Sequence, residues 1–285
     1  MAVVVGDFGA TNIRLAVLRS GQMSDIYRFA CDDFQDAYAV LQSFVYGYVP
    51  DVSSVLLGVP GPVVNGSVSW TNRSWRLDEK KLKKMFNLQQ VFLKNDLVVQ
   101  GEALSCLSKK DFVVLQKGKA RRGVKVLANV GTGLGVCFVC DGQVFPAEYG
   151  PTLLEDGMPL EKIVSATGFK ALYADIKGEE GVSSSEIFKR FQAKETAALE
   201  TYELFYLYLG RTLMNLALTF QAVGGVYFAG NMLDEHTLQY FKIIEKFLAH
   251  PTMRPILKEI PVVFVKRKDF AFLGFTKLVK KYGLS

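Results

Sequence analysis

Two stretches of the sequence follow one plan, in which an apolar run leads into a short turn of glycine and threonine and a second apolar run follows. They are "VVVGDFGATNIRLAV" at residues 3–17 and "VLANVGTGLGVCFV" at residues 126–139. Valine- and leucine-rich runs on both sides of a glycine turn predict two strands in a hairpin. A plan that occurs twice predicts a duplicated fold, with one such hairpin in each of two domains.

The rest of the chain alternates short β-branched runs with helical patterns, which is typical of an α/β fold. In the first third, strands are expected at "AVVVG", "IRLAVL", "SVLLGVP", "GSVSW" and "VFLKN", and helices at residues 34–48 and 78–86. After "KGKARRG", strands are expected at "VKVLANV", "LGVCFVC", "GGVYFAG" and "PVVFVKR", and helices at 159–176, 185–191, 194–220 and the final "FAFLGFTKLVKKYG". We therefore expect two α/β domains with a boundary near residue 105.

The composition is that of a globular protein. With 285 residues and 49% hydrophobic content, the chain is long enough for two domains with their own cores. The first apolar run is short, contains Asp7 and has no basic leader, so we do not expect a signal peptide. The most apolar later stretch, residues 204–228, is interrupted by Arg211 and does not predict a membrane span. We expect a cytoplasmic enzyme with no membrane partner.

Charge and cysteine usage argue against two further classes of protein. The net charge of +6 is diffuse, and clusters such as "KARRG" and "KRK" lack the interleaved aromatic residues of a nucleic-acid surface. Cys137 and Cys140 are spaced CxxC, but in the strand-like run "GVCFVCDG" residues three apart point to opposite faces. The two histidines, His236 and His250, are expected on the surface of charged helical segments. We therefore expect neither a nucleic-acid partner nor a zinc site.

Each glycine turn presents backbone N–H groups and one hydroxyl, from Thr11 in the first turn and Thr132 in the second. Such concavities bind phosphate oxygens. Taken singly, each turn is better explained as a hairpin that uses glycine for positive φ, since neither matches the Rossmann or P-loop spacing. Taken together, and with Asp7 in the first turn alone, they predict one site for a metal and a nucleotide, with the carboxylate facing Mg2+ through water.

These motifs resemble those of the bacterial glucokinase family, in the actin-like sugar kinase superfamily, nearly end to end. "GDFGATNIRLAV" is similar to the first phosphate motif of that family, "NVGTGLGV" to the second and "GGVYFAGNM" to the adenosine motif. "TNRSW", "KND", "FPAEYG" and "EKIVSATG" follow in family order. The resemblance implies an actin-like ATPase (ribonuclease H-like) duplicated fold with an interdomain cleft. It also implies a small domain of residues 1–105 plus 271–285, a large domain of 106–270, and a homodimer.

The resemblance further implies an ATP-dependent hexose kinase, most simply a glucokinase, which transfers the γ-phosphoryl group of MgATP to the sugar 6-hydroxyl. Asp96 matches the catalytic base and Asp7 the residue near the metal. The residues that match sugar ligands are Asn72, Asn95, Glu148 and Glu161. The residues that match nucleotide-binding positions are Gly6, Asp7, Gly9, Thr11, Asn12, Gly131, Thr132, Gly133 and Gly230.

Structural explanations stand beside some of these roles. An aspartate before a helical stretch is a favoured N-cap, which accounts for Asp96 without catalysis. Glu161 follows Pro159, and an acidic residue in the first turn of a helix is stabilised by the helix dipole. Glu148 has no comparable local explanation. We favour the catalytic and sugar-binding roles because the residues match the family motifs.

The sequence also departs from the family pattern. The family places "GGH" after its first sugar-binding glutamate, whereas this chain has "EYGP", with Pro151 in place of the histidine. One sugar contact is then missing, which costs on the order of 1–3 kcal/mol, although Tyr149 could supply a hydroxyl or be buried in packing. Three alternatives follow: a kinase for another hexose, a kinase for an N-acetylhexosamine, or a weakly active or non-catalytic sugar or nucleotide sensor on the same fold. Ala10 and Asn231 replace family glycines; Ala10 is tolerated if its φ is negative, and Asn231 suits a left-handed turn.

Overall fold

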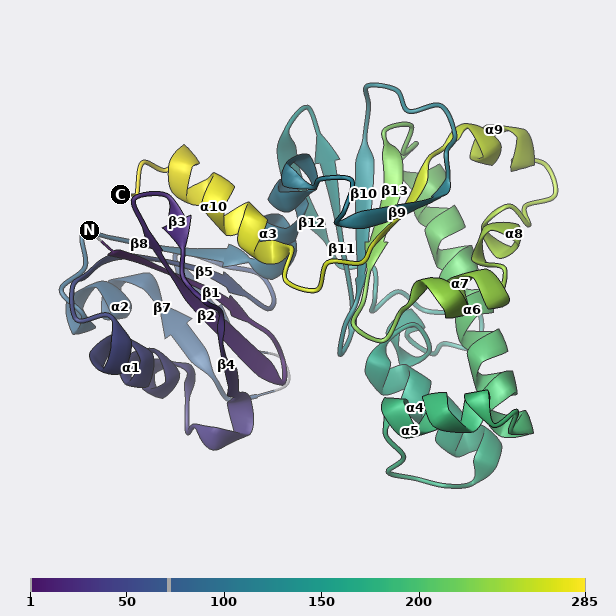
Figure 1. Ribbon diagram of the computed structural model, residues 1–285, viewed down its shortest axis with the longest axis horizontal. Helices are drawn as coiled ribbons and strands as arrows, with labels where there is room; N and C mark the ends of the chain where they lie inside the picture. Colours follow the sequence, from purple (N-terminus) through teal and green to yellow (C-terminus); the bar gives the residue numbers. More distant parts are fainter. Residues whose placement is uncertain (1, 71–72, 285) are drawn as a thin grey trace. The chain divides into compact units, whose positions relative to one another are not determined.

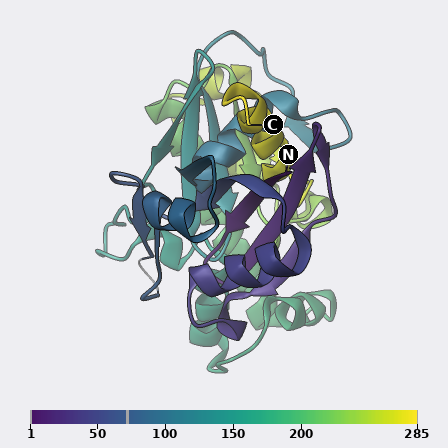
Figure 2. The same cartoon turned by 90° about the vertical axis from the view of Figure 1, so that its left-hand side faces the viewer.

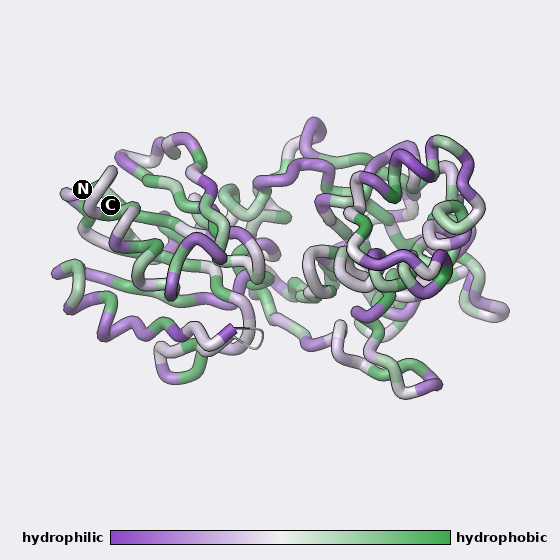
Figure 3. Tube along the Cα trace, turned by 90° about the horizontal axis from the view of Figure 1, so that it is seen from below, coloured by the Kyte–Doolittle hydropathy of each residue, from purple (hydrophilic) through white to green (hydrophobic). Residues whose placement is uncertain are grey.

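The computed structural model describes residues 2–70 and 73–284. Its contacts divide the chain into two compact units (Figure 1). Unit 1 comprises Met1–Leu107 and Asp269–Ser285, and unit 2 comprises Ser108–Lys268. Asn72, one of the predicted sugar ligands, lies outside the described residues. In each unit the hydrophobic residues gather on the strands and inner helix faces, and the connecting loops are mostly hydrophilic (Figure 3).

Unit 1 is built on a mixed sheet in the order β3-β2-β1-β5-β8, with β4 also paired to β2. Its strands are β1 (Ala2–Phe8), β2 (Asn12–Arg19), β3 (Gln22–Met23), β4 (Tyr27–Ala30), β5 (Val52–Val59) and β8 (Gln90–Asn95). β1 and β2 form the predicted antiparallel hairpin, while β1, β5 and β8 run parallel. The carboxyl ends of β1, β5 and β8 therefore share one edge of the sheet.

Helices cover both faces of this sheet. They are α1 (Ala37–Tyr48), α2 (Glu79–Met85), α3 (Asp96–Ala103) and α10 (Ala271–Lys281), and a small ribbon of β6 (Ser67–Ser69) and β7 (Arg76–Asp78) lies beside them. Val4 and Phe8 of β1 pack on the side of α1, and Val3 and Val5 pack on the side of α3 and α10. Figure 2 shows α1 lying across the strands. Burial on both faces explains why β1 is a continuous apolar run rather than an alternating one.

Unit 2 has a second mixed sheet in the order β12-β11-β10-β13-β14-β9. Its strands are β9 (Phe112–Gln116), β10 (Lys125–Val130), β11 (Leu134–Cys140), β12 (Gln143–Ala147), β13 (Gly225–Ala229) and β14 (Val262–Val265). β10 and β11 form the second predicted hairpin, and β10, β13 and β14 run parallel. The order β11-β10-β13-β14 repeats β2-β1-β5-β8 of unit 1, so the predicted duplication is confirmed at the level of strand topology.

The helices of unit 2 bury one large core against this sheet. They are α4 (Ala166–Lys177), α5 (Ser184–Gln192), α6 (Thr196–Thr219), α7 (Glu235–Tyr240), α8 (Ile243–Phe247) and α9 (Arg254–Glu259). The core is rich in aromatic residues, and Phe205 and Tyr206 of α6 are fully buried in it. Within the described residues, no helix is long and apolar enough to cross a membrane.

One predicted helix begins later than expected. Residues 159–176 were expected to be helical throughout, but α4 begins at Ala166, after a short 3-10 turn at Leu160–Lys162. The hydroxyl of Ser165 accepts a hydrogen bond from the Gly168 N–H at 2.9 Å and so caps the helix there. Glu161 therefore precedes α4, and the explanation of this residue as a first-turn acid of that helix is wrong.

Candidate functional site

Asp7 lies near the carboxyl end of β1, directly opposite Arg14 of β2 in the hairpin register. The two side chains form an ion pair, and Asp7 is 6% exposed. The Arg14 guanidinium also lies 5.9 Å from the centre of the Phe272 ring on α10. The carboxylate that the sequence places in a bare turn is thus buried and held by a cation from the neighbouring strand.

The first glycine turn, between β1 and β2, is closed by its own hydrogen bond. The Gly9 N–H donates to the Asn12 carbonyl oxygen at 3.0 Å. Neither Gly9 nor Ala10 has a positive φ, so the explanation of this glycine by positive φ is wrong and Ala10 is unstrained. A Cβ at position 9 would instead lie 2.9 Å from the Asn12 carbonyl oxygen. This close approach leaves no room for a side chain, so glycine is favoured at position 9. In the described part of the chain, the Ala10 N–H has no protein acceptor and remains available to a ligand.

Arg73 fixes this turn from outside. Its Nε donates to the Ala10 carbonyl at 3.1 Å, and its Nη2 lies 2.7 Å from Asp32. Its guanidinium also lies 5.2 Å from the centre of the Trp75 ring. The turn is therefore held before any ligand binds, which reduces the entropy lost on binding.

The second turn, between β10 and β11, is closed in a similar way by the Gly131 N–H, which donates to the Gly133 carbonyl at 2.9 Å. Its glycines also lack positive φ. Within the described residues the Gly133 N–H has no protein acceptor. Gly131 additionally accepts the Ala166 N–H at 2.8 Å, which ties the turn to the start of α4. Thr11 and Thr132 are exposed in their respective turns.

Asn95 and Asp96 mark the end of β8 and the beginning of α3. Asn95, not Asp96, is the N-cap: its Oδ1 accepts the Leu97 N–H at 2.9 Å, while its Nδ2 donates to the Gly61 carbonyl at 3.1 Å. The explanation of Asp96 as the capping residue is therefore wrong, since Asp96 is the first residue of the helix. β5 alone separates β1 from β8, and the register places Asp7 level with Lys94, two strand spacings or ~10 Å away; Asp96 begins α3 two residues beyond Lys94.

Glu161 lies against the second glycine turn. Its Oε2 accepts the Leu134 N–H in a long hydrogen bond of 3.4 Å. A Cβ added to Gly133 would lie 2.7 Å from this oxygen, and one added to Gly150 would lie 3.1 Å from it. The two glycines thus make room for the carboxylate.

Glu148 is exposed in the segment that follows β12. The next residue, Tyr149, packs against the core of unit 2. Burial raises the pKa of the Tyr149 phenol above its ordinary value. Pro151 is exposed in the turn beyond.

Three further predicted positions have packing roles in the structure. A Cβ at Gly6 would lie 2.5 Å from a Leu15 methyl group, and one at Gly230 would lie 2.7 Å from the Val130 carbonyl oxygen. Asn12 begins β2 and closes the first turn through its carbonyl group. Asn231 has no positive φ, so the expectation that it adopts a left-handed turn is wrong. Nucleotide contacts from Gly6, Asn12 and Gly230 stay predictions.

The residues present suit Mg2+ that arrives with phosphates. No cluster of three or more histidine, cysteine or acidic side chains with metal-binding geometry occurs among residues 2–70 and 73–284. Mg2+ typically uses one or two carboxylates together with phosphate oxygens and water, rather than an all-protein cage. Asp7, a single buried carboxylate beside a turn with an available N–H, fits that pattern.

Comparison with known proteins decides the family. The Glucokinase family profile matches residues 4–150 and 154–282. The chain belongs to the glucokinase family. Curated glucokinases of Nostoc punctiforme and Tolumonas auensis are 26% and 27% identical to it, and the alignments cover 95% of this chain and 97% and 95% of those proteins. The match is interrupted at residues 151–153, where Pro151 replaces the expected histidine.

Solved structures agree on the fold. A glucokinase from an Antarctic psychrotroph superposes with a TM-score of 0.79 at 21% identity, over 98% of this chain and 99% of that one. A glucokinase from Balamuthia mandrillaris, in complex with glucose, gives 0.81 at 20% identity, over 98% and 93%. The predicted actin-like two-domain α/β fold class is therefore confirmed.

Sequence reasoning missed two arginines of the site. Arg14 had a detectable signal, because a hairpin centred between Ala10 and Thr11 places residues 7 and 14 opposite each other. Arg73 had no such signal, since its contacts to Ala10 and Asp32 are separated from it by tens of residues in the sequence.

Proposed function

We propose that this protein is an ATP-dependent glucokinase, which transfers the γ-phosphoryl group of ATP to the 6-hydroxyl of glucose. The observation that carries the proposal is the arrangement in unit 1: a buried aspartate beside a phosphate-type turn, and a second aspartate two strands away at the same sheet edge. This arrangement suits a metal-bound phosphate and a general base in one reaction. The family relationship supports the same activity.

Asp96 is proposed as the general base. The Leu97 N–H is shared between Asn95 Oδ1 at 2.9 Å and Asp96 Oδ1 at 3.0 Å, so capping of α3 does not depend on the Asp96 carboxylate alone. It would accept the proton of the 6-hydroxyl as the sugar oxygen attacks the γ-phosphorus. General base catalysis of this kind typically contributes roughly 100- to 10,000-fold in rate.

Each glycine turn is proposed to contact phosphate oxygens of ATP. The N–H groups of Ala10 and Gly133 donate to phosphate oxygens, together with the hydroxyls of Thr11 and Thr132. Asp7, whose carboxylate is held in place by its ion pair with Arg14, would serve Mg2+ that arrives with the phosphates. When bound, Mg2+ neutralises charge on the phosphates.

The sugar is proposed to be held by Asn95, Glu148 and Glu161, and by Asn72. Asn95 has one further Nδ2 hydrogen available after its bond to Gly61. The Glu161 carboxylate retains acceptor capacity beyond its long bond to the Leu134 N–H. Carboxylates suit this role because each accepts more than one hydroxyl hydrogen bond, strengthened by charge.

Pro151 gives one specific reason to consider a second activity on the same site. Proline lacks a side-chain donor, and Tyr149 packs against the core of unit 2. A kinase for another hexose or an N-acetylhexosamine, or a sugar or nucleotide sensor with little turnover, would follow if glucose needs the missing contact.

A coupled ADP-release assay with glucose, mannose, fructose, glucosamine and the N-acetylhexosamines tests the proposal. Turnover fastest with glucose is expected. Turnover chiefly with another sugar would change the substrate, and sugar binding without any turnover would replace the kinase by a sensor. From the family resemblance we also propose that the protein is cytoplasmic and forms a homodimer. Light scattering during size-exclusion chromatography would test the homodimer.

A further inference from the structure

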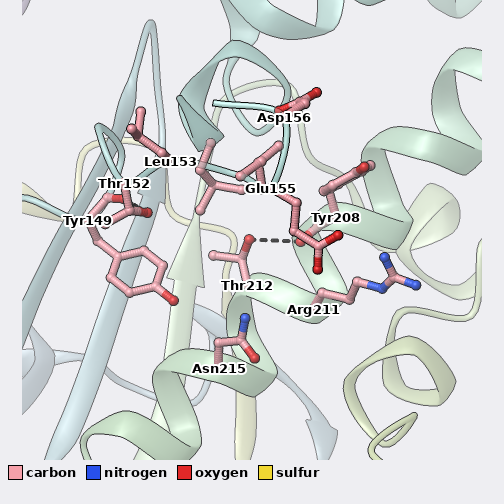
Figure 4. Close-up of a pocket in the computed structure, with 11 residues that line it drawn as sticks. Tyr149, Thr152, Leu153, Glu155, Asp156, Tyr208, Arg211, Thr212 and Asn215 are labelled. Atoms are coloured by element: carbon pink, nitrogen blue, oxygen red, sulfur yellow. Dashed lines mark hydrogen bonds between the residues drawn. The ribbon is translucent and has the colours of Figure 1, made fainter. Parts of the chain in front are cut away.

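Unit 2 contains a pocket of about 640 Å³ between the segment that follows β12 and the long helix α6 (Figure 4). Pockets of roughly 300–1,000 Å³ are the size that commonly holds a small ligand. Residues 149–160 form one wall, and the α6 side chains of Arg211, Thr212 and Asn215 form the other. None of the described residues proposed above to hold ATP or the sugar lines this pocket.

Two opposite charges without ion-pair partners face the pocket. Arg211 lies 6.0 Å from the centre of the Tyr208 ring and, within the part of the chain that the structure describes, forms no ion pair. Glu155, on the opposite wall, has no hydrogen bond or ion pair to the described residues. Figure 4 shows the Glu155 carboxylate and the Arg211 guanidinium toward the same end of the pocket, although they come from facing walls. The lining of the pocket therefore includes a fork of donors on Arg211 and a pair of acceptor oxygens on Glu155.

Neutral polar groups complete the wall. Tyr149 and Asn215 both line the pocket, and burial raises the pKa of the Tyr149 phenol, so it stays uncharged at neutral pH. The hydroxyls of Thr152 and Thr212 donate to the carbonyl groups of Tyr149 and Tyr208 at 2.7 Å each. Both hydroxyl oxygens keep acceptor capacity toward a ligand.

This set of groups selects the class of ligand. Arg211 is one positive charge, whereas Glu155 and Asp156 are two negative charges on the lining, which disfavours phosphorylated or other strongly anionic ligands. A neutral ligand rich in hydroxyl groups can donate to the carboxylate, accept from the guanidinium and pack against the tyrosine ring. We infer that this pocket binds a neutral sugar at a second site, outside the proposed catalytic site.

Part of the pocket lining lies outside the family match. The family match stops at Gly150 and resumes at Leu154, and both Thr152 and Leu153 from the unmatched interval line the pocket. Two of the residues that line the pocket therefore come from a segment outside the family match.

The same segment joins two proposed substrate ligands, Glu148 and Glu161. It is pinned at its far end, where the Leu160 N–H donates to Thr152 and the Glu161 N–H to Gly150, at 2.8 and 3.0 Å. A sugar in the pocket would hold this segment in one conformation and so alter sugar affinity at the catalytic site. This regulatory consequence rests on the proposed function, whereas sugar binding in the pocket does not.

Titration calorimetry with glucose and with maltose tests the second site. In Glu148→Gln/Glu161→Gln protein, we expect one of these sugars to bind with a stoichiometry of one per chain. Adding Arg211→Met and Asn215→Leu should weaken that binding at least tenfold, while Arg122→Met, at a fully exposed arginine of the same unit, should leave it unchanged. Absence of binding in the Glu148→Gln/Glu161→Gln protein, or binding that is insensitive to Arg211→Met and Asn215→Leu, would overturn the inference.

Circular dichroism checks whether the Arg211→Met/Asn215→Leu protein folds. If it does not fold, Tyr149→Phe is tested in its place. Loss of the hydroxyl should weaken sugar binding about fivefold, the equivalent of one hydrogen bond, and an unchanged affinity would count against the site. The coupled kinase assay is run separately on the wild-type protein. Sugar binding in the pocket without kinase turnover would reject the proposed function and support the second site. Turnover without sugar binding in the pocket would support the proposed function and reject the second site.

Discussion

Glu102 of α3 and Lys277 of α10 form an ion pair in which the Oε2 and Nζ atoms are 2.6 Å apart. Glu102 is 3% exposed, and a second lysine, Lys281, donates to its Oε1 at 3.1 Å. The two helices also approach closely, because a Cβ at Gly274 would lie 2.0 Å from the Val99 carbonyl oxygen. The last helix of the chain is thus fixed to the helix that begins with the proposed base, Asp96.

Glu102→Gln should destabilise the protein by about 1–3 kcal/mol, because two lysines lose a charged hydrogen-bond acceptor. Burial raises the pKa of Glu102, but its interactions with the ammonium groups of Lys277 and Lys281 outweigh burial and leave the pKa below its ordinary value. The stabilising effect is therefore complete above the unfolded-state pKa of about 4.3 and is lost as the pH falls through the lower folded-state pKa.

Thermal unfolding of the wild-type and Glu102→Gln proteins between pH 7 and pH 3 measures this effect. The difference in Tm should be largest at neutral pH and shrink in acid. Glu245→Gln, at an exposed glutamate paired with a lysine on the surface, is the control and should change Tm little. A Tm difference that is constant across this pH range would contradict the prediction.

Asp96→Asn should lower kcat by roughly 100- to 10,000-fold, since asparagine cannot accept the proton of the sugar hydroxyl. Stability should be retained, because the cap of α3 is supplied by Asn95. Steady-state kinetics and thermal unfolding separate the two effects. Asn95→Ala is the matched variant: it should lose about 1 kcal/mol of stability with the cap. Turnover by Asp96→Asn close to the wild-type rate would remove the base assignment.

Asp7→Asn should raise the Mg2+ concentration needed for half-maximal turnover at least tenfold, because the neutral amide is a weaker partner for the metal and its water. The protein should stay folded, since the amide oxygen still accepts from Arg14. The control is Asp51→Asn, which removes another Arg–Asp pair of the same sheet, formed with Arg19 on the surface. An Mg2+ dependence identical in all three proteins would show that Asp7 does not serve the metal.

The elements that sequence reasoning located best are those whose partners are local. Both hairpins were predicted because apolar runs flank a turn within a few residues, and the register confirms them. The start of α4 was missed because distant hydrogen bonds decide it: the Leu160 and Glu161 N–H groups donate to Thr152 and Gly150 rather than into a helix. The helix propensity of residues 159–165 depends only on the local sequence and cannot reveal those distant acceptors.

The candidate site shows the same division. Asn95 and Asp96 are both good capping residues, so the sequence could not tell which of them caps α3. Pairing of Asn95 with Val59 extends β8 by one residue and settles the choice. The glycines of the two turns were recognised, but the physical reason for two of them was not predicted. Gly9 is required by its close approach to Asn12 and Gly133 by its close approach to Glu161, and neither has a positive φ.

Gly133→Ala tests the contact between the second turn and the proposed sugar ligand. The new Cβ would lie 2.7 Å from the Glu161 Oε2, so the carboxylate must move away from the Leu134 N–H. Because a flexible side chain can yield, stability should change by less than about 1 kcal/mol. Sugar affinity, measured without ATP by calorimetry, should fall at least threefold. Gly131→Ala is the matched variant, since its Cβ would meet nothing nearer than the Gly133 oxygen at 3.8 Å, and its sugar affinity should match the wild type. Equal sugar affinities in Gly133→Ala and Gly131→Ala would mean that the position of the Glu161 carboxylate does not govern sugar binding.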